Sequence, residues 1–234
     1  MENNKELVKI NKKSTAREYA EALTIAILLA LFIRTFIIQA FKIPSGSMKP
    51  TLLIGDHLLV NKFIYGIKIP FLDKYVIQFK KPERGDVVVF KYPENESLDF
   101  IKRVIGIEGD TIEIRNDQLY INNKKIENKL IDQNLKSQLI DVYNDNEMIN
   151  ADAYEETIDN KKHIILDKSP GHENFGPIKV PEDSIFVMGD NRDNSEDGRK
   201  WRQTHFVKLE KIEGKAFIIY WSWPNWKRFF NIIR

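Results

Sequence analysis

The feature that most constrains this chain is an apolar segment close to its N-terminus. Residues 22–33 are apolar except for Thr24, and further apolar residues follow Arg34. The strict apolar run is short for a membrane span, but a helix over about residues 19–38 would be roughly 30 Å long, which matches the hydrocarbon thickness of a bilayer. Arg34 would lie near one end, where its side chain can reach the interface. We therefore predict a transmembrane helix over residues 18–38.

The residues before this segment predict its orientation. Residues 1–17 contain five lysines and arginines against two glutamates. Thr15 followed by Glu18 fits a capping box, which is typical of a helix start. Cytoplasmic flanks of membrane spans carry an excess of basic residues. We expect residues 1–17 in the cytoplasm and residues 39–234 outside it.

Two other interpretations of the apolar segment stay open. A cleaved signal peptide also combines a basic start with a short apolar run. No A-x-A cleavage pattern follows here, since the next residues are Gln39, Ala40 and Phe41. The other alternative is a buried helix of a soluble protein.

After Lys42 the chain consists mainly of short β-like runs separated by turn signals such as Asn116-Asp117. The runs are residues 86–90, 111–115, 118–121, 184–188 and 215–221. This pattern predicts a mostly β domain with a partly closed, barrel-like sheet. The stretch of about residues 122–179 is polar and weakly periodic, which indicates an inserted subdomain or a long excursion.

Charge and cysteine content exclude several classes of function. Lysine and arginine total 36 and aspartate and glutamate 34, a net charge of +2, so we expect no nucleic-acid partner. The chain has no cysteine, which excludes disulfides, thiolate zinc sites and a cysteine nucleophile.

Two serines stand in a constrained segment after the apolar run. Pro44 and Pro50 stiffen the backbone around Ser45-Gly46-Ser47, and glycine permits unusual dihedral angles. A serine nucleophile needs such a fixed position and a nearby base. Alone, however, a Ser-Gly-Ser sequence usually forms only a turn.

Lysine is the better candidate for the base. The four histidines lie in no triad motif, and there is no G-x-S-x-G motif, so we expect structural or solvated roles for His57, His163, His172 and His205. In an alternating strand, Lys102 would share a face with Phe100 and Val104. Burial among apolar side chains lowers a lysine pKa, and the neutral amine can then accept a serine proton. A strand lysine is more often simply exposed.

The third polar element is the loop of residues 189–199. A calcium loop starting at Asp193 would need glutamate at its twelfth position, which is Thr204, so we expect no metal. The alternative is a polar loop whose Asp and Asn side chains cap turns.

Together these elements resemble the motif set of the type I signal peptidases. The matching motifs are Pro44–Thr51, Gly85–Phe90, Lys102–Gly106 and Gly189–Arg199, and the resemblance runs from about Thr35 to Tyr220 with a poorly matching middle. Each motif is modest evidence, but the combination is specific.

The resemblance implies a serine endopeptidase without a cofactor. It would remove N-terminal signal peptides from secreted preproteins through an acyl-enzyme, at the outer face of the bacterial cytoplasmic (inner) membrane. Its partners would be the preproteins and the lipid bilayer. The implied fold is a mostly β catalytic domain with a β subdomain inserted at about residues 111–183.

The resemblance also implies a role for each matching residue. Ser47 matches the nucleophile and Lys102 the general base. The oxyanion hole would consist of the Ser45 side chain and the Ser47 backbone N–H. The other matches support the site or line shallow P1 and P3 pockets: Ser195, which orients the lysine amine; Asp197 and Arg199, an ion pair behind the site; and Ile43, Phe100 and Ile101 at the pockets.

The sequence departs from the family pattern at two places. Gly198 stands where serine is frequent, and residues 202–205 stand where the family usually has one glycine. Neither departure displaces the matching residues, although the second leaves the local loop geometry open.

Two other functions fit parts of this pattern. The first is a membrane-anchored, non-catalytic peptide-binding protein, which would not need Ser47 or Lys102. The second is a self-cleaving repressor-type Ser-Lys protease, which would have neither the span nor the motif at residues 189–199. For the aromatic run of residues 217–226 we consider a core strand or a patch at the membrane interface.

Overall fold

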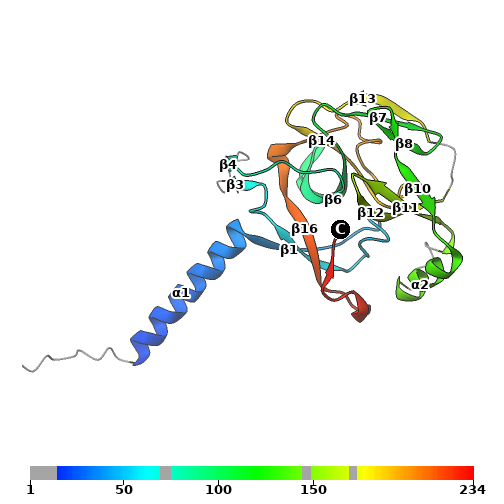
Figure 1. The fold of residues 1–234 in the computed structure, drawn as a ribbon. Helices are drawn as coiled ribbons and strands as arrows, with labels where there is room; N and C mark the ends of the chain where they lie inside the picture. Colours follow the sequence, from blue (N-terminus) through cyan, green and yellow to red (C-terminus); the bar gives the residue numbers. More distant parts are fainter. Residues whose placement is uncertain (1–14, 69–74, 144–148, 169–172) are drawn as a thin grey trace, which may run out of the picture.

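The computed structural model describes residues 15–68, 75–143, 149–168 and 173–234. Most of the predicted cytoplasmic segment 1–17, and His172, lie outside these residues. The apolar segment forms α1 (Thr15–Phe36), which stands away from the β domain and buries none of its side chains (Figure 1). It is long and apolar enough to cross a membrane. The exposure of its apolar side chains does not fit a buried helix of a soluble protein.

The rest of the chain is mostly β, as predicted. The largest sheet has the strand order β1-β2-β16-β5-β6-β14-β15, with β17 beside β16, and its pairs are antiparallel. Its strands are β1 (Ile38–Lys42), β2 (His57–Asn61), β5 (Val87–Tyr92), β6 (Asn95–Ile107), β14 (Ser184–Met188), β15 (Val207–Lys208), β16 (Ile212–Trp221) and β17 (Asn231–Ile232). Over the described residues, no hydrogen-bonded pairing of β1 with β15 closes this sheet into a barrel.

The described residues also form three smaller sheets. One is the hairpin of β3 (Gly66–Lys68) and β4 (Tyr75–Gln78). A second has the order β13-β7-β8-β9 and a third the order β10-β11-β12. Their strands are β7 (Thr111–Arg115), β8 (Gln118–Ile121), β9 (Lys124–Lys125), β10 (Glu127–Leu130), β11 (Asp152–Ile158), β12 (Lys161–Asp167) and β13 (Phe175–Lys179). Three short helices, α2 (Gln133–Tyr143), η1 (Leu209–Lys211) and η2 (Trp226–Arg228), lie between strands.

The predicted strands at 111–115, 118–121 and 184–188 coincide with β7, β8 and β14, and those at 86–90 and 215–221 with most of β5 and β16. The turn between β7 and β8 has positive φ at both Asn116 and Asp117, as a tight hairpin turn requires. Helix α2 was not predicted. Its signal is the side chain of Asp132, which accepts a hydrogen bond from the Leu135 backbone N–H at 2.7 Å and so caps the helix start.

A buried carboxylate ties the C-terminal segment to the loop between β1 and β2. Asp56 is 1% exposed and accepts hydrogen bonds from Leu53 N at 2.8 Å, Ser222 Oγ at 2.6 Å and Arg228 Nη2 at 2.6 Å. Arg228 Nη2 also donates to the Thr51 carbonyl at 2.9 Å. The loop that follows the two serines is therefore held by residues far along the chain.

The variant Asp56→Ala tests this connection. It leaves the Arg228 guanidinium buried without its carboxylate, and we expect the free energy of unfolding to fall by about 3–5 kcal/mol. The measurement is denaturant unfolding of the detergent-solubilised chain. The control is Glu96→Ala, which removes the exposed partner of Lys211 and is expected to cost less than about 1 kcal/mol. Equal losses for the two variants would contradict the prediction.

Candidate active site

Ser47 lies in a turn between β1 and β2 that is anchored from below. The backbone of Lys49 donates to the Gly46 carbonyl at 3.1 Å, and Leu52 donates to the Met48 carbonyl at 2.9 Å. Met48 and Leu52 are fully buried in the core beneath the large sheet. The turn is therefore fixed by its own hydrogen bonds and by two apolar anchors, while Ser47 itself stays 7% exposed.

Lys102 comes from β6, which lies between β5 and β14 in the large sheet. Its side chain is 3% exposed, and its Nζ donates to Ser47 Oγ at 2.8 Å and to the Ile101 carbonyl at 3.0 Å. The Nζ also lies 5.1 Å from the centre of the Phe100 ring, in agreement with the shared strand face. The fold thus brings the predicted nucleophile and base into direct hydrogen-bond contact.

Burial dominates the electrostatics of this lysine. Loss of solvent lowers the pKa of Lys102 from 10.5 to about 8, although the carboxylates of Asp197, Asp190 and Glu196 act in the opposite direction. A neutral amine is therefore accessible at mildly alkaline pH. Such an amine can accept the Ser47 proton, which an ordinary exposed lysine cannot do near neutrality.

An open cleft of about 460 Å³ surrounds the two side chains. It is lined by Pro44–Ser47 of the turn, by Asp99–Lys102 in the middle of β6, and by five residues of the loop 193–200. Phe100 and Ile101, two of the predicted pocket residues, are among them. Ile43 is 2% exposed and packs in the core next to the turn, so it supports the cleft from beneath without lining it.

Ser45 lies at the mouth of this cleft. Its side chain is exposed, and its Oγ is 3.4 Å from Ser47 Oγ. Ser45 is thus next to the predicted nucleophile, and its part in an oxyanion hole stays a prediction.

Ser195 lines the cleft opposite the turn, but the two hydrogen bonds of the lysine amine described above go elsewhere. The predicted orienting contact is therefore not formed in this geometry, and the role stays a prediction. The lack of a side chain at Gly189 allows Ser195 and the Ser47 carbonyl to lie close to the backbone of this residue. A methyl group on Gly189 would lie 2.3 Å from Ser195 Oγ and 2.4 Å from the Ser47 carbonyl oxygen.

The predicted pair Asp197–Arg199 lies behind the cleft. The guanidinium binds the carboxylate through two hydrogen bonds of 2.8 Å, and both side chains are buried. Asp197 also accepts the Gly189 backbone N–H at 2.9 Å, and Arg199 donates to the Arg192 carbonyl at 2.6 Å. The pair therefore fixes the backbone of the loop that carries Ser195.

Three residues of the site received no role from the sequence. Asn191 donates its backbone N–H to the Ser47 carbonyl and its side-chain amide to the Gly46 carbonyl, both at 3.1 Å. Arg103 is fully buried and binds Asp190 through bonds of 2.8 and 2.7 Å. Strand alternation was the available signal, because it places Arg103 on the face opposite Lys102, where a buried arginine needs a carboxylate.

The described histidines do not line the cleft. His57 packs edge-on against Tyr220, with ring centres 5.9 Å apart, and His205 Nδ1 lies 2.6 Å from the Gly198 carbonyl. His163 is buried on β12 beside Glu156. Among the described residues, no cluster of three or more His, Asp or Glu side chains could hold a metal ion.

The unusual segment 202–205 is accommodated by the turn between β5 and β6. The backbone N–H groups of Arg202 and Gln203 donate to Glu94 Oε1 at 2.6 and 2.7 Å. This contact leaves the pair of Ser47 and Lys102 in place.

Comparison with known proteins agrees with the family resemblance of the sequence motifs. Residues 16–221 match the family described as "Signal peptidase, peptidase S26". The chain is 39% identical to signal peptidase I of Pseudomonas fluorescens over 227 residues, which cover 93% of this chain and 76% of that protein. It is 39% identical to signal peptidase I of Aquifex aeolicus (strain VF5) over 235 residues, which cover 88% of this chain and 84% of that protein.

A solved structure of a signal peptidase I from Enterococcus faecalis V583 aligns with 59% of this chain and 98% of its own, at 32% identity and a TM-score of 0.34. The match to the family covers α1 and the motifs at the turn, on β6 and in the loop 189–199. The chain therefore belongs to the signal peptidase family, peptidase S26.

Proposed function

We propose that this protein is a signal peptidase I that removes N-terminal signal peptides from secreted preproteins, with Ser47 as nucleophile and Lys102 as general base. The observation that carries the residue assignment is the 2.8 Å contact between a buried lysine amine and Ser47 Oγ, in a chain of this family. A non-catalytic peptide-binding protein would have no use for a desolvated lysine in that position.

The chemistry begins with the neutral amine. As Ser47 Oγ attacks the scissile carbonyl carbon, Lys102 Nζ accepts the hydroxyl proton. The carbonyl oxygen becomes an oxyanion, which the Ser47 backbone N–H and the Ser45 hydroxyl can bind. One such donor contributes about 3–4 kcal/mol to transition-state stabilisation.

Collapse of this intermediate breaks the peptide C–N bond. The Lys102 ammonium gives its proton to the departing amine, which leaves with the mature protein, while the signal peptide stays bound to Ser47 as an ester. Lys102, neutral again, then takes a proton from a water molecule that attacks the ester carbonyl. The second collapse returns that proton to Ser47 Oγ and releases the signal peptide, so no cofactor is needed.

The cleft suits an extended peptide with small side chains. Phe100 and Ile101 line it beside the reacting pair and support their assignment to shallow P1 and P3 pockets. Ile43 would support these pockets from the core, behind the residues that line them. Ser195 would orient the Lys102 amine after a small movement of its side chain, and Asp197 and Arg199 would hold the loop in place.

We also propose the domain division given by the sequence. Residues 1–17 would be cytoplasmic and 18–38 transmembrane. Residues 39–234 would form a partly closed, barrel-like catalytic domain outside the bacterial inner membrane, with the subdomain inserted at about 111–183. Ser47 follows the last residue of α1 closely in sequence, so a short connection would keep the nucleophile near the outer membrane surface, where the cleavage sites of preproteins emerge.

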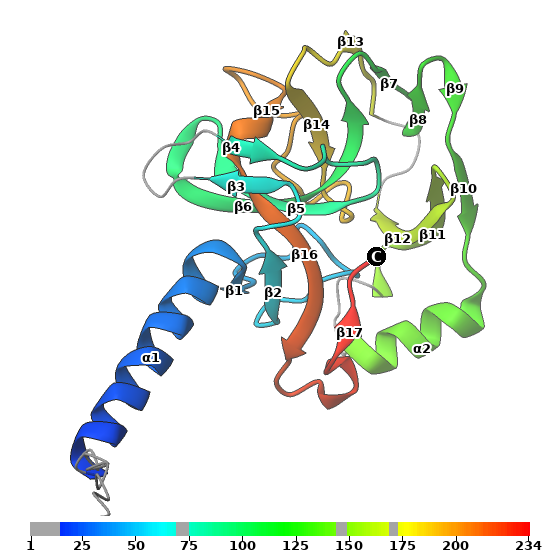
Figure 2. The ribbon, with the colours of Figure 1, turned by 60° about the vertical axis from the view of Figure 1, so that its left-hand side comes forward.

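An exposed aromatic patch supports a second contact with the bilayer. At the end of β16 and beyond it, the tryptophan side chains at 221, 223 and 226 and the phenylalanine at 230 are 43%, 62%, 57% and 71% exposed. Figures 1 and 2 show this segment, in red, on the side of the domain from which α1 departs. Tryptophan with nearby cations is favoured at the membrane interface.

Substitutions at the reacting pair test the mechanism. Ser47→Ala and Lys102→Ala should each abolish cleavage of a secretory precursor by the detergent-solubilised enzyme, and the double variant should be little worse, because both act in one proton transfer. Lys102→Arg should be inactive, since a guanidinium keeps its proton. His57→Ala is the control and should retain substantial activity. An active Ser47→Ala enzyme would end the mechanism.

The pH dependence gives an independent test of the base. Below the pKa of Lys102 the amine carries a proton and cannot accept another, so kcat/KM should rise with pH and level off above an inflection near 8. Ser195→Ala should weaken transition-state stabilisation by about 1–3 kcal/mol, because it would remove the proposed orienting bond but not the base. The measurement is a pH–rate profile on a peptide with Ala at P1 and P3. A flat profile would show that Lys102 is not the base.

The absence of cysteine allows the membrane contact to be measured by single labelling. We expect a nitroxide on Trp223→Cys, in chain reconstituted into vesicles with anionic lipid, to collide with oxygen in the lipid phase more than with a water-soluble reagent. The control label is Lys124→Cys on β9, which Figure 2 shows on the far side of the domain from α1. Equal accessibility of the two labels to the water-soluble reagent would disprove the second contact.

A further inference from the structure

The inserted region touches the loop that supports the nucleophile. Leu166 of β12 donates its N–H to the Asp190 carbonyl and accepts the Arg192 N–H at its own carbonyl, both at 2.9 Å, in a parallel bridge with Asn191. On its other side, Asn191 holds the carbonyls of Gly46 and Ser47. Residues 190–192 therefore lie between the insertion and the nucleophile turn and are bonded to both.

Residues 190–192 are also bonded to the strand that carries Lys102. Asp190 binds the guanidinium of Arg103, the residue next to Lys102 on β6. A displacement of residues 190–192 would thus act on Ser47 through Asn191 and on the strand of Lys102 through Asp190. The reacting atoms need alignment to within a fraction of an ångström, and a misplacement of about 1 Å can cost on the order of 100-fold in rate.

One buried ion pair holds this segment to the insertion through its side chains. Arg192 Nη1 and Nη2 donate to the two carboxylate oxygens of Glu156, on β11, at 2.9 and 2.6 Å. The two side chains are 8% and 1% exposed. Burial alone raises the pKa of Glu156, but the Arg192 guanidinium and His163 outweigh it and hold that pKa well below its usual range, so the carboxylate stays charged.

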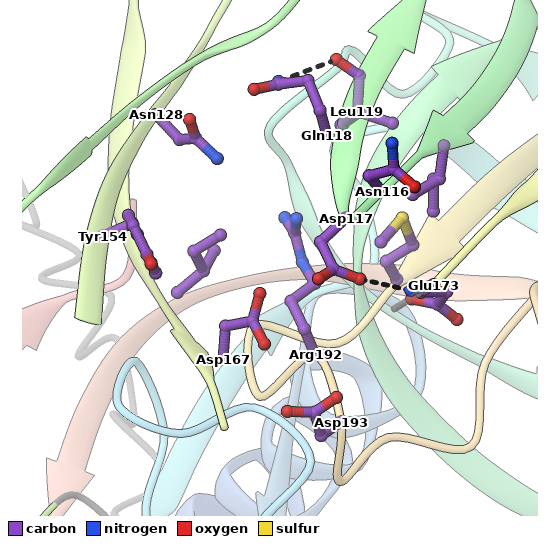
Figure 3. A pocket seen from close by; sticks show the side chains of 13 residues that line it. Asn116, Asp117, Gln118, Leu119, Asn128, Tyr154, Asp167, Glu173, Arg192 and Asp193 are labelled. Carbon is purple, nitrogen blue, oxygen red and sulfur yellow. Dashed lines mark hydrogen bonds between the residues drawn. The ribbon is translucent and has the colours of Figure 1, made fainter. Parts of the chain in front are cut away.

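The packing around Arg192 is incomplete on one side of its side chain. Figure 3 shows Arg192 and Asp193 at the edge of a cavity of about 160 Å³, with Asp117 and Glu173 on one side and Tyr154 on the other. Close packing cannot fix Arg192 on the side where this space lies. The position of Arg192 therefore depends on its two hydrogen bonds to Glu156. These bonds fix the distance between the guanidinium and the carboxylate and the plane in which the two groups lie.

We propose that Glu156 is a positioning residue for cleavage: through Arg192 it fixes residues 190–192, and through them the contact between Ser47 and Lys102. The proposal rests on the proposed function. It makes the insertion part of the catalytic unit, although none of its described residues lines the cleft around the reacting pair.

The first test is Glu156→Gln, assayed in the detergent-solubilised full chain. The amide keeps the shape of the side chain but places an NH2 group opposite the guanidinium donors, so one of the two hydrogen bonds from Arg192 is lost. We expect kcat to fall about 10- to 100-fold with KM changed less than about twofold, because alignment is lost and substrate contacts are not. The inflection of the pH–rate profile should move to higher pH, since a looser site admits water to the Lys102 amine.

The matched control is Glu155→Gln, the preceding residue on β11. Its side chain is 40% exposed and pairs with Lys162 at the surface, so kcat and the inflection should match the parent enzyme. Thermal unfolding of each variant gives the temperature range in which the assays compare folded proteins.

A second variant keeps the test decisive if Glu156→Gln does not fold. Arg192→Lys retains the charge opposite Glu156 but cannot form two parallel hydrogen bonds to it. We therefore expect a folded enzyme with a smaller loss of kcat, and an inflection of the pH–rate profile that also moves to higher pH. The proposal is wrong if a folded variant keeps the parent kcat and inflection. It is also wrong if the lost activity only follows the unfolded fraction while the inflection stays in place. Active Ser47→Ala enzyme would instead refute the proposed function itself.

Discussion

The site depends on the burial of one amine. The role proposed for Lys102 as a base requires that its Nζ is removed from water and lies 2.8 Å from Ser47 Oγ. Burial requires strands on both sides of β6, and contact requires a turn that brings Ser47 over that strand. The apolar anchors Met48 and Leu52 meet the second requirement, since they fix the turn on the core. The large sheet and its core are therefore conditions for the proposed chemistry.

The carboxylates around this amine would oppose its deprotonation if they stood alone. Asp190 and Asp197 are buried and ionised, because Arg103 and Arg199 outweigh the effect of burial and hold their pKa values below the usual range. Each carboxylate is thus half of a tight ion pair with little net charge to present to Lys102. Loss of solvent then remains the largest influence on the lysine, and its pKa falls to about 8. The arginines behind the site support the base indirectly.

The sequence predicted most of what depends on local pattern. Strands such as 111–115 were correct because alternation and turn residues are local signals, and the family motifs named Ser47 and Lys102 for a contact that the fold forms. Helix α2 was missed because its short amphipathic pattern lies in a polar stretch, where only Asp132 marks its start. The partners of Arg103, Asn191 and Glu156 are distant in sequence. Their pairing follows from the tertiary arrangement, which spacing alone does not contain.

The proposed insertion contacts the rest of the β domain at two places with different consequences. At its base, Lys179 of β13 pairs with Thr111 of β7, and Val180 donates to the Asp110 carbonyl at 2.8 Å. The chain therefore leaves and returns at adjacent points, so the length of the insertion can differ among relatives without moving β6 relative to the loop 189–199. The contact of β12 and Glu156 with residues 190–192 is a constraint of another kind, because it requires one part of the insertion to keep its place beside the nucleophile turn.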